Sequence, residues 1–124
     1  MATVSVQDGT LFVELRRWDK ILAVHGSLRI PLTHVTAASS GPAPPVPWLR
    51  KIVGTNVPGV MAAGTFFDRH GFAFYDYHAG TECLLLEIDH EFYKNAVIEI
   101  DPPQTATEAA ALVAAALVKA RGSP

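Results

Sequence analysis

The residues of this 124-residue chain that could carry out chemistry are its histidines and the acids near them. Two histidines and one carboxylate can hold a metal ion, and His70, His78 and Asp76 could supply them if turns at one end of the fold converge. No histidine pair has the tight spacing of a motif such as H-E-x-x-H, so we favour the alternative of histidines in solvated turns. The histidines are His25, His34, His70, His78 and His90, and the acids near three of them are Asp68, Asp76, Asp89 and Glu91.

The one thiol of the chain is Cys83, in the apolar run 82–86. A small buried thiol is ordinary there, and a single cysteine excludes a disulfide framework and a zinc site built on cysteines. The stretch 54–59 lacks the Gly-Lys-Ser/Thr ending of a phosphate-binding loop, and Ser39 lacks the G-x-S-x-G context of a nucleophile. We therefore predict a protein with no catalysis, no metal and no required cofactor.

Two short blocks that combine tryptophan with basic residues are the most suggestive surface feature. Exposed Trp and Arg dominate binding hot spots, so the blocks could bind a protein partner, an acidic peptide or an anionic membrane surface. Alternatively, both rings pack on the edge of the domain while the charges are solvated. Single-stranded nucleic acid would need more positive charge and a row of aromatics, so we expect no nucleic-acid partner. The candidate binding residues are Arg16, Arg17, Trp18 and Lys20 in the first block and Trp48, Arg50 and Lys51 in the second.

Size and charge place the chain among single globular domains. Ten Lys and Arg residues against twelve Asp and Glu residues, with both signs scattered, exclude a polybasic tail as its main feature. No apolar run reaches the roughly 20 residues that span a bilayer, and the first residues lack the blocks of a signal peptide. We therefore expect one cytoplasmic domain over residues 1–124.

Turn signals divide most of the chain into short strands. An Asp-Gly pair between two alternating runs predicts a hairpin of strands at 2–7 and 10–16. A helical turn should end at Gly26, extended chain should lie on both sides of Pro31, and stiff loop should cover 39–47. We further expect one turn at 48–51, a loop at 54–59, and then an antiparallel meander of strands. The four strands of the meander are expected at 60–67, 72–77, 82–88 and 96–100, with core faces formed by Leu84, Leu86 and Ile88 and by Ala96, Ile98 and Ile100.

The last segment has a helical period, and we expect a helix over about 103–121. It could begin at Asp101 with the prolines that follow, or at a capping box formed by Thr105 and Glu108. Leu112 and Leu117 are expected to dock on the sheets, within a stripe that also includes Ala109, Val113, Ala116 and Ala120. The smooth alanine face of Ala110, Ala111, Ala114 and Ala115 is then a plausible contact for a second copy, so we expect a homo-oligomer, most simply a dimer.

These elements predict a mainly β protein, an antiparallel sandwich or barrel of about seven strands capped by a C-terminal helix. Over roughly residues 11–118 the chain resembles the bacterial pleckstrin-homology-like domain family, small stand-alone proteins of actinobacteria. The stretches that carry the resemblance are Arg29-Ile30-Pro31-Leu32, Pro58-Gly59-Val60, Ala63-Gly64-Thr65-Phe66, Leu85-Leu86-Glu87-Ile88 and Val97-Ile98-Glu99-Ile100-Asp101-Pro102.

The resemblance implies two nearly orthogonal antiparallel sheets with the helix across one corner, a fold used mostly to bind lipid head groups, peptides or partner proteins. Phosphoinositide-binding members carry Lys and Arg around the first hairpin loop, whereas here that loop is Gln7-Asp8-Gly9-Thr10, and no Trp follows Trp48. We therefore predict a non-catalytic binding or assembly module. The alternative is a small-molecule or metal-binding protein, or a weak enzyme, that uses the His and Asp residues of the turns.

Overall fold

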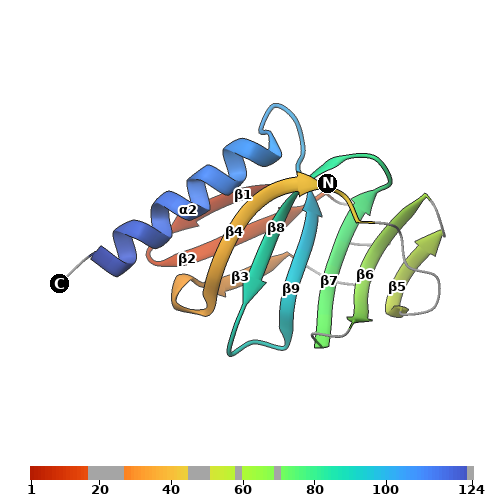
Figure 1. Ribbon diagram of the computed structural model, residues 1–124, viewed down its shortest axis with the longest axis horizontal. Coiled ribbons are helices and arrows are strands. Elements are labelled where there is room, and N and C mark those ends of the chain that lie inside the picture. Colours follow the sequence, from red (N-terminus) through yellow and green to blue (C-terminus); the bar gives the residue numbers. More distant parts are fainter. Residues whose placement is uncertain (17–26, 45–50, 58–59, 69–70, 123–124) are drawn as a thin grey trace.

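The structure, a computed structural model, describes residues 1–16, 27–44, 51–57, 60–68 and 71–122 (Figure 1). In these residues nine strands form one sheet of three strands and one of six, and helix α2 (Ala106–Gly122) follows them. The predicted class, a mainly β sandwich capped by a C-terminal helix, is confirmed, with nine strands in place of about seven.

The smaller sheet contains the predicted hairpin, strands β1 (Ala2–Gln7) and β2 (Thr10–Leu15), followed by β3 (Leu28–Pro31). Asp8 and Gly9 have positive φ angles of 50° and 74°. Two such residues make the turn type whose twist matches a two-residue hairpin, so this prediction is confirmed. The alternation places Val4, Leu11 and Val13 in the main core.

The larger sheet has the order β4-β8-β9-β7-β6-β5. Its strands are β4 (Val35–Pro42), β5 (Lys51–Val57), β6 (Met61–Asp68), β7 (Gly71–His78), β8 (Glu82–Ile88) and β9 (Tyr93–Glu99). Strand β9 lies between β7 and β8 and runs parallel to β7, so the prediction of a simple meander is wrong. Ala96, Val97 and Ile98 of β9 are all buried, which suits a central strand with both faces covered.

Three segments differ from the loops and extended chain expected of them. Residues 39–42 belong to β4, an edge strand of the sheet, where a proline is tolerated. Residues 54–57 belong to β5 because Gly54 allows close contact with β6: a Cβ there would lie 2.1 Å from the Ala63 carbonyl oxygen. Leu32–His34 form a short 3-10 helix, η1, between β3 and β4. The helical turn expected before Gly26 and most of the turn expected at 48–51 lie outside the described residues.

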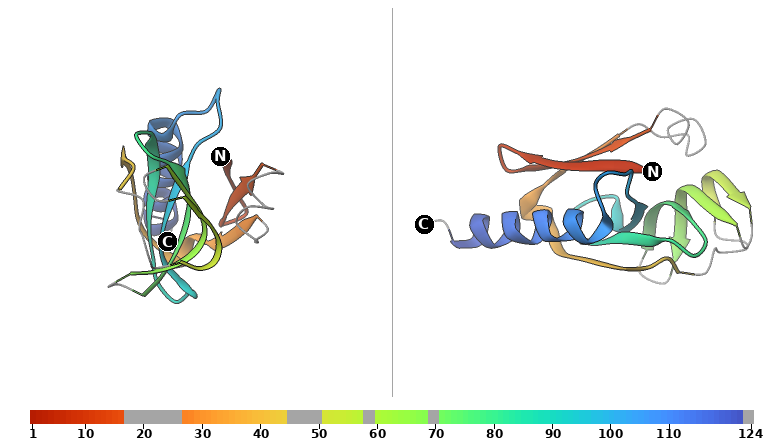
Figure 2. Two further views of the ribbon diagram at one scale, coloured as in Figure 1. Left: turned by 90° about the vertical axis from the view of Figure 1, so that its right-hand side faces the viewer. Right: turned by 90° about the horizontal axis from the view of Figure 1, so that it is seen from above.

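The inner faces of the two sheets and one side of α2 enclose the main core. Helix α2 contacts β4, β1 and β8, so it covers the gap between the sheets along one edge (Figures 1 and 2). The smaller sheet lies over the part of the larger sheet that contains β4 and β8, whereas β5 and β6 extend beyond it (Figure 2). The predicted core faces of β8 and of 96–100 are confirmed, since all six of their side chains lie in this core.

Helix α2 begins at the second of the two predicted starts. The Thr105 N–H donates to Glu108 Oε1 at 3.0 Å, and the Glu108 N–H donates to Thr105 Oγ1 at 3.1 Å. This capping box satisfies two N–H groups that would otherwise lack partners. The Gln104 side chain joins this start to β1, because it accepts from the Val4 N–H at 2.9 Å and donates to the Val4 carbonyl at 3.0 Å.

No helix in the described residues is long and apolar enough to cross a membrane.

The docked face of α2 confirms the predicted stripe at Ala109, Val113 and Leu117 and differs from it at Leu112 and Ala120, which are exposed. Ala109, Val113 and Leu117, four residues apart along the helix, are buried, but Leu112 is 41% exposed. Leu112 and Val113 are neighbours in the sequence and point about 100° apart around the helix, so docking through Val113 leaves Leu112 at the margin of the contact. Ala110 is buried as well, so only part of the predicted alanine face lies at the surface.

Replacing Val113 with Asp would bury an unpaired charge, and we expect a loss of about 3 kcal/mol or more in the free energy of unfolding. The matched change Leu112→Asp should cost less than about 1 kcal/mol, because that side chain reaches solvent. Urea unfolding of both variants measures the difference. Equal losses would contradict the observed helix face.

Candidate functional site

A cleft of about 410 Å³ opens between β3 and the turn that joins β8 to β9. Leu28 and Ile30 of β3 and Ile88 of β8 line it and are almost fully buried, so its floor is part of the main core. Phe92 and Tyr93 form an aromatic wall, and Ser27, Arg29 and Glu91 add polar groups. Its size lies within the roughly 300–1,000 Å³ of small-molecule sites.

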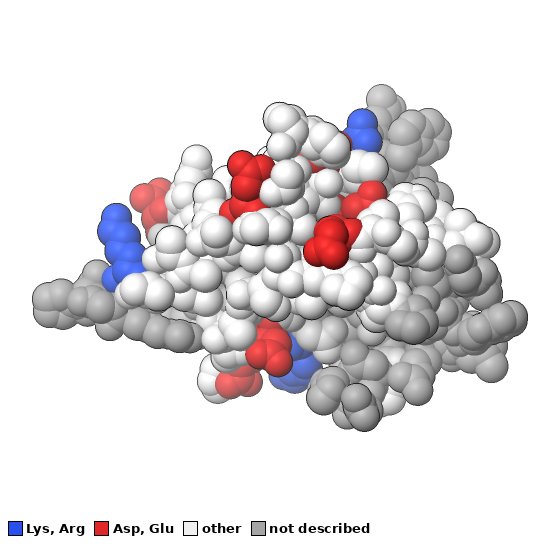
Figure 3. Space-filling view, turned by 45° about the horizontal axis from the view of Figure 1, so that its top comes forward, with Lys and Arg blue, Asp and Glu red and all other residues white. Residues whose placement is uncertain are grey.

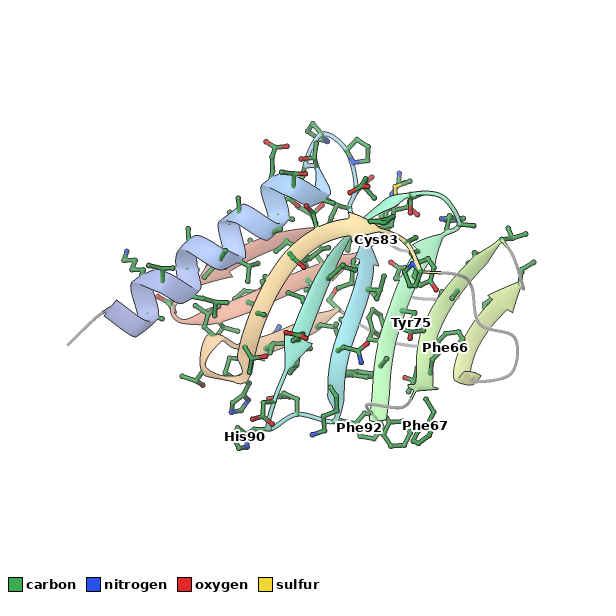
Figure 4. The ribbon with its side chains drawn as sticks, in the orientation of Figure 1. Phe66, Phe67, Tyr75, Cys83, His90 and Phe92 are labelled. Carbon is green, nitrogen blue, oxygen red and sulfur yellow. The ribbon has the colours of Figure 1, made fainter. Side chains whose placement is uncertain are left out.

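Beside the cleft, two exposed phenylalanines, Phe67 and Phe92, and the half-buried Phe72 form what we name the aromatic end. Their ring centroids lie 5.6 Å apart for Phe67 and Phe72, in an edge contact, and 4.4 Å apart for Phe72 and Phe92, which stack. Both separations are near the range that aromatic pairs favour. Phe67 is 51% exposed and Phe92 is 60% exposed, and Figure 4 shows the two close together at one end of the larger sheet. This end of the molecule therefore presents stacked rings to solvent.

Tyr93 connects the aromatic end to the core. Its hydroxyl lies 2.6 Å from Thr65 Oγ1, and its ring makes an edge contact with buried Phe74 at 5.5 Å. Burial raises the pKa of Tyr93, and the hydrogen bond with Thr65 partly opposes that shift. The phenol is therefore neutral at physiological pH and acts as a fixed wall of the cleft.

The turn that carries Phe92 is held by η1. His34 Nδ1 lies 2.5 Å from Glu91 Oε2, and the Asp89 N–H donates to the His34 carbonyl at 2.7 Å. Lys94 Nζ also donates to the Glu91 carbonyl at 2.9 Å. The His90 ring lies 5.7 Å from that of His34, yet in the described part of the chain no group of three or more His, Cys, Asp or Glu residues could hold a metal ion.

The residues of the alternative metal site have separate partners. His78 Nδ1 lies 2.9 Å from Glu99 Oε1, which also accepts from the His78 N–H. Asp76, almost fully buried, accepts from the Met1 ammonium at 3.1 Å. His25 and His70 lie outside the described residues. Because His70 lies outside the described residues, the metal site of His70, His78 and Asp76 stays a prediction.

Of the seven predicted binding residues, the structure describes two. Arg16 follows β2 in the smaller sheet, where its Nε lies 3.5 Å from Asp101 Oδ2. Lys51 begins β5 at the edge of the larger sheet. On the face shown in Figure 3 the described basic side chains stand apart from one another. The other five, Arg17, Trp18, Lys20, Trp48 and Arg50, lie outside the described residues, so the site that joins the two blocks stays a prediction.

Cys83 is fully buried, as predicted, on the outer side of the larger sheet (Figure 4). Burial raises its pKa, the negative charges of Glu99, Glu82 and Asp76 raise it further, and a hydrogen bond with Thr81 opposes them. Burial also raises the pKa of Tyr77 in the same cluster. These groups are neutral parts of the packing.

Sequence reasoning did not identify the aromatic end. The available signal was Phe67 and Phe72, one on each side of the turn between β6 and β7, together with Phe92 just before β9.

Searches against known protein families, curated proteins and solved structures find no match to this chain. The functional argument therefore depends on the geometry at this end of the sandwich.

Alkaline pH should destabilise the fold. The pKa values of Cys83, Tyr77 and Tyr93 are raised in the folded state, so above about pH 8.5 the unfolded chain binds fewer protons than the folded chain. The stabilisation that comes from these three raised pKa values is fully present below that pH. It is lost as the pH rises through the pKa values of the folded state. Urea unfolding at pH 7 and pH 10 measures this loss, which should be smaller in Cys83→Ala. Stability that increases over this interval would contradict the assignment.

The predicted tryptophan and basic site can be tested with vesicles that contain phosphatidylserine. We expect the chain to bind them less at high salt, because exposed charges are screened over about 8–10 Å. The triple change Trp48→Ala, Arg50→Glu and Lys51→Glu should abolish binding and leave the melting temperature nearly unchanged. An unfolded triple variant would place Trp48 in the core, and binding by a folded one would exclude the site.

Proposed function

We propose that this chain is a non-catalytic assembly module that associates with a second copy of itself through the aromatic end. The observation that carries the proposal is the stack of Phe67, Phe72 and Phe92, whose rings contact one another while two of them stay more than half exposed. Aromatic residues are enriched in the buried centres of protein interfaces and are unusual as an exposed group on a monomer.

The surroundings of the aromatic end favour a second copy as its partner. Lys94 lies beside it, since a Cβ on Gly71, next to Phe72, would be 3.1 Å from Lys94 Cγ. Asp89, at 61% side-chain exposure, and His90 lie in the turn just before Phe92. A two-fold interface must complement itself, and an apolar centre flanked by both charge signs meets that requirement. Lys94 of one copy can then face Asp89 of the other.

The exposed face of α2 is the competing surface for self-association. It presents Leu112, Val118 and two exposed alanines, Ala111 and Ala115. The aromatic end is favoured because its rings offer more rigid apolar area for each residue buried. The resemblance to pleckstrin-homology-like domains, a fold used mostly for binding, supports the same class of function.

Sedimentation velocity on the whole chain tests the proposal. We expect wild type to be a dimer and Phe92→Asp to be a monomer with a nearly unchanged melting temperature, because Phe92 is 60% exposed. The control Val118→Asp, at another exposed apolar residue, should remain a dimer. Dissociation by Val118→Asp alone would assign the interface to α2. A monomeric wild type would overturn self-association.

A further inference from the structure

We infer that the cleft between β3 and the β8–β9 turn binds a small uncharged aromatic molecule of one or two rings. Phe67 and Phe72 do not line this cleft. The inference goes beyond the proposed function and does not depend on self-association.

The inner part of the cleft is an apolar floor. Leu28, Ile30 and Ile88 line it, and each of these residues is no more than 6% exposed. A ring placed against these side chains would remove its apolar surface from water. The volume of about 410 Å³ lies toward the small end of the range for ligand sites, so it suits a molecule of one or two rings.

The wall of the cleft is aromatic and is already held in position. The ring centroids of Phe92 and Tyr93 lie 5.3 Å apart in an edge arrangement. Stacking on Phe72 holds the Phe92 ring, and the hydrogen bond with Thr65 holds the Tyr93 hydroxyl. Aromatic rings pack well on one another, and a wall that is ordered before binding loses little entropy when the ligand enters. These contacts favour a ring as the bound part of the ligand.

The Arg29 side chain places no positive charge in the cleft. Successive residues of a strand point to opposite faces, and Leu28 and Ile30 of β3 point into the core. Arg29 therefore points to the other face of the smaller sheet, where its Cζ lies 5.8 Å from the centroid of the Phe12 ring. A carboxylate in the cleft would find no guanidinium there.

Ser27 and Glu91, which also line the cleft, have protein partners. The Ser27 hydroxyl donates to Glu14 Oε2 at 2.9 Å, and Glu91 Oε2 pairs with His34 Nδ1. The Lys94 ammonium donates to the Glu91 carbonyl at 2.9 Å, so a positive charge offsets the Glu91 carboxylate within the same turn. An ion that entered the cleft would lose water without gaining a partner of opposite charge, and this favours an uncharged ligand.

Acetophenone, benzoate and benzamidine test the inference, because they are similar in size and shape but are uncharged, negative and positive at pH 7. In NMR titrations of the whole chain we expect acetophenone to shift the methyl signals of Ile30 and Ile88. Benzoate and benzamidine should each bind at least about tenfold more weakly, since each would lose hydration at the apolar floor.

Variants of the wall give a second measurement. Phe92→Ala should weaken acetophenone binding about tenfold, because a ring contact is lost, and should leave the melting temperature nearly unchanged, because Phe92 is 60% exposed. Phe92→Tyr keeps the ring and should bind acetophenone as wild type does. The matched control Phe67→Ala removes an exposed ring that does not line the cleft, and it should bind acetophenone at least as tightly as wild type does.

Equal or tighter binding of benzoate or benzamidine would overturn the inference, as would no binding of acetophenone to wild type or unchanged affinity in a folded Phe92→Ala variant. A loss in Phe67→Ala equal to that in Phe92→Ala would assign the binding to the aromatic end in place of the cleft. Shifts confined to Leu117, which lines a separate cavity beside α2, would also overturn the inference. A monomeric wild type leaves every one of these outcomes unchanged, so the two proposals fail separately.

Discussion

The structure depends on the burial of strand β9 on both of its faces. Ala96 and Ile98 belong to the core between the sheets, and Val97 belongs to the cluster on the outer side. Because both faces of β9 are buried at these residues, its backbone groups there need partners, which β7 and β8 supply from its two sides. At its end Ile100 bridges to Ala2, and the Asp101 N–H donates to the Ala2 carbonyl at 2.7 Å. This strand therefore joins the two sheets.

The place of β9 also determines where a binding site can form. The turn that leads into it projects from the sandwich opposite β3, and contacts with η1 hold it there through His34. Phe92 and Tyr93 consequently stand across from Leu28 and Ile30, with a cleft between them. Local bonds in a short segment thus position side chains contributed by both sheets.

A difference in width between the sheets explains the exposed rings. Strands β5 and β6 extend beyond the smaller sheet (Figure 2), so inner-face residues at that side have less cover. Along this face Phe74 is fully buried, Phe72 is half-buried and Phe67 is 51% exposed. Exposed apolar rings cost free energy in water, and that cost is recovered when a partner covers them. The same alternation that builds the core therefore also leaves aromatic rings at the surface.

The sequence by itself determined the local features: the Asp8 and Gly9 hairpin, the capping box of Thr105 and Glu108, and the shared face of Leu84, Leu86 and Ile88. Each depends on residues a few positions apart, whose backbone preferences and side-chain period act within one element. Only the tertiary structure decided that β9 separates β7 from β8, that Leu112 lies outside the docked part of the predicted stripe, and that Phe67 is exposed. Alternation tells which residues share a face, but the element that covers the face is chosen by packing between distant segments.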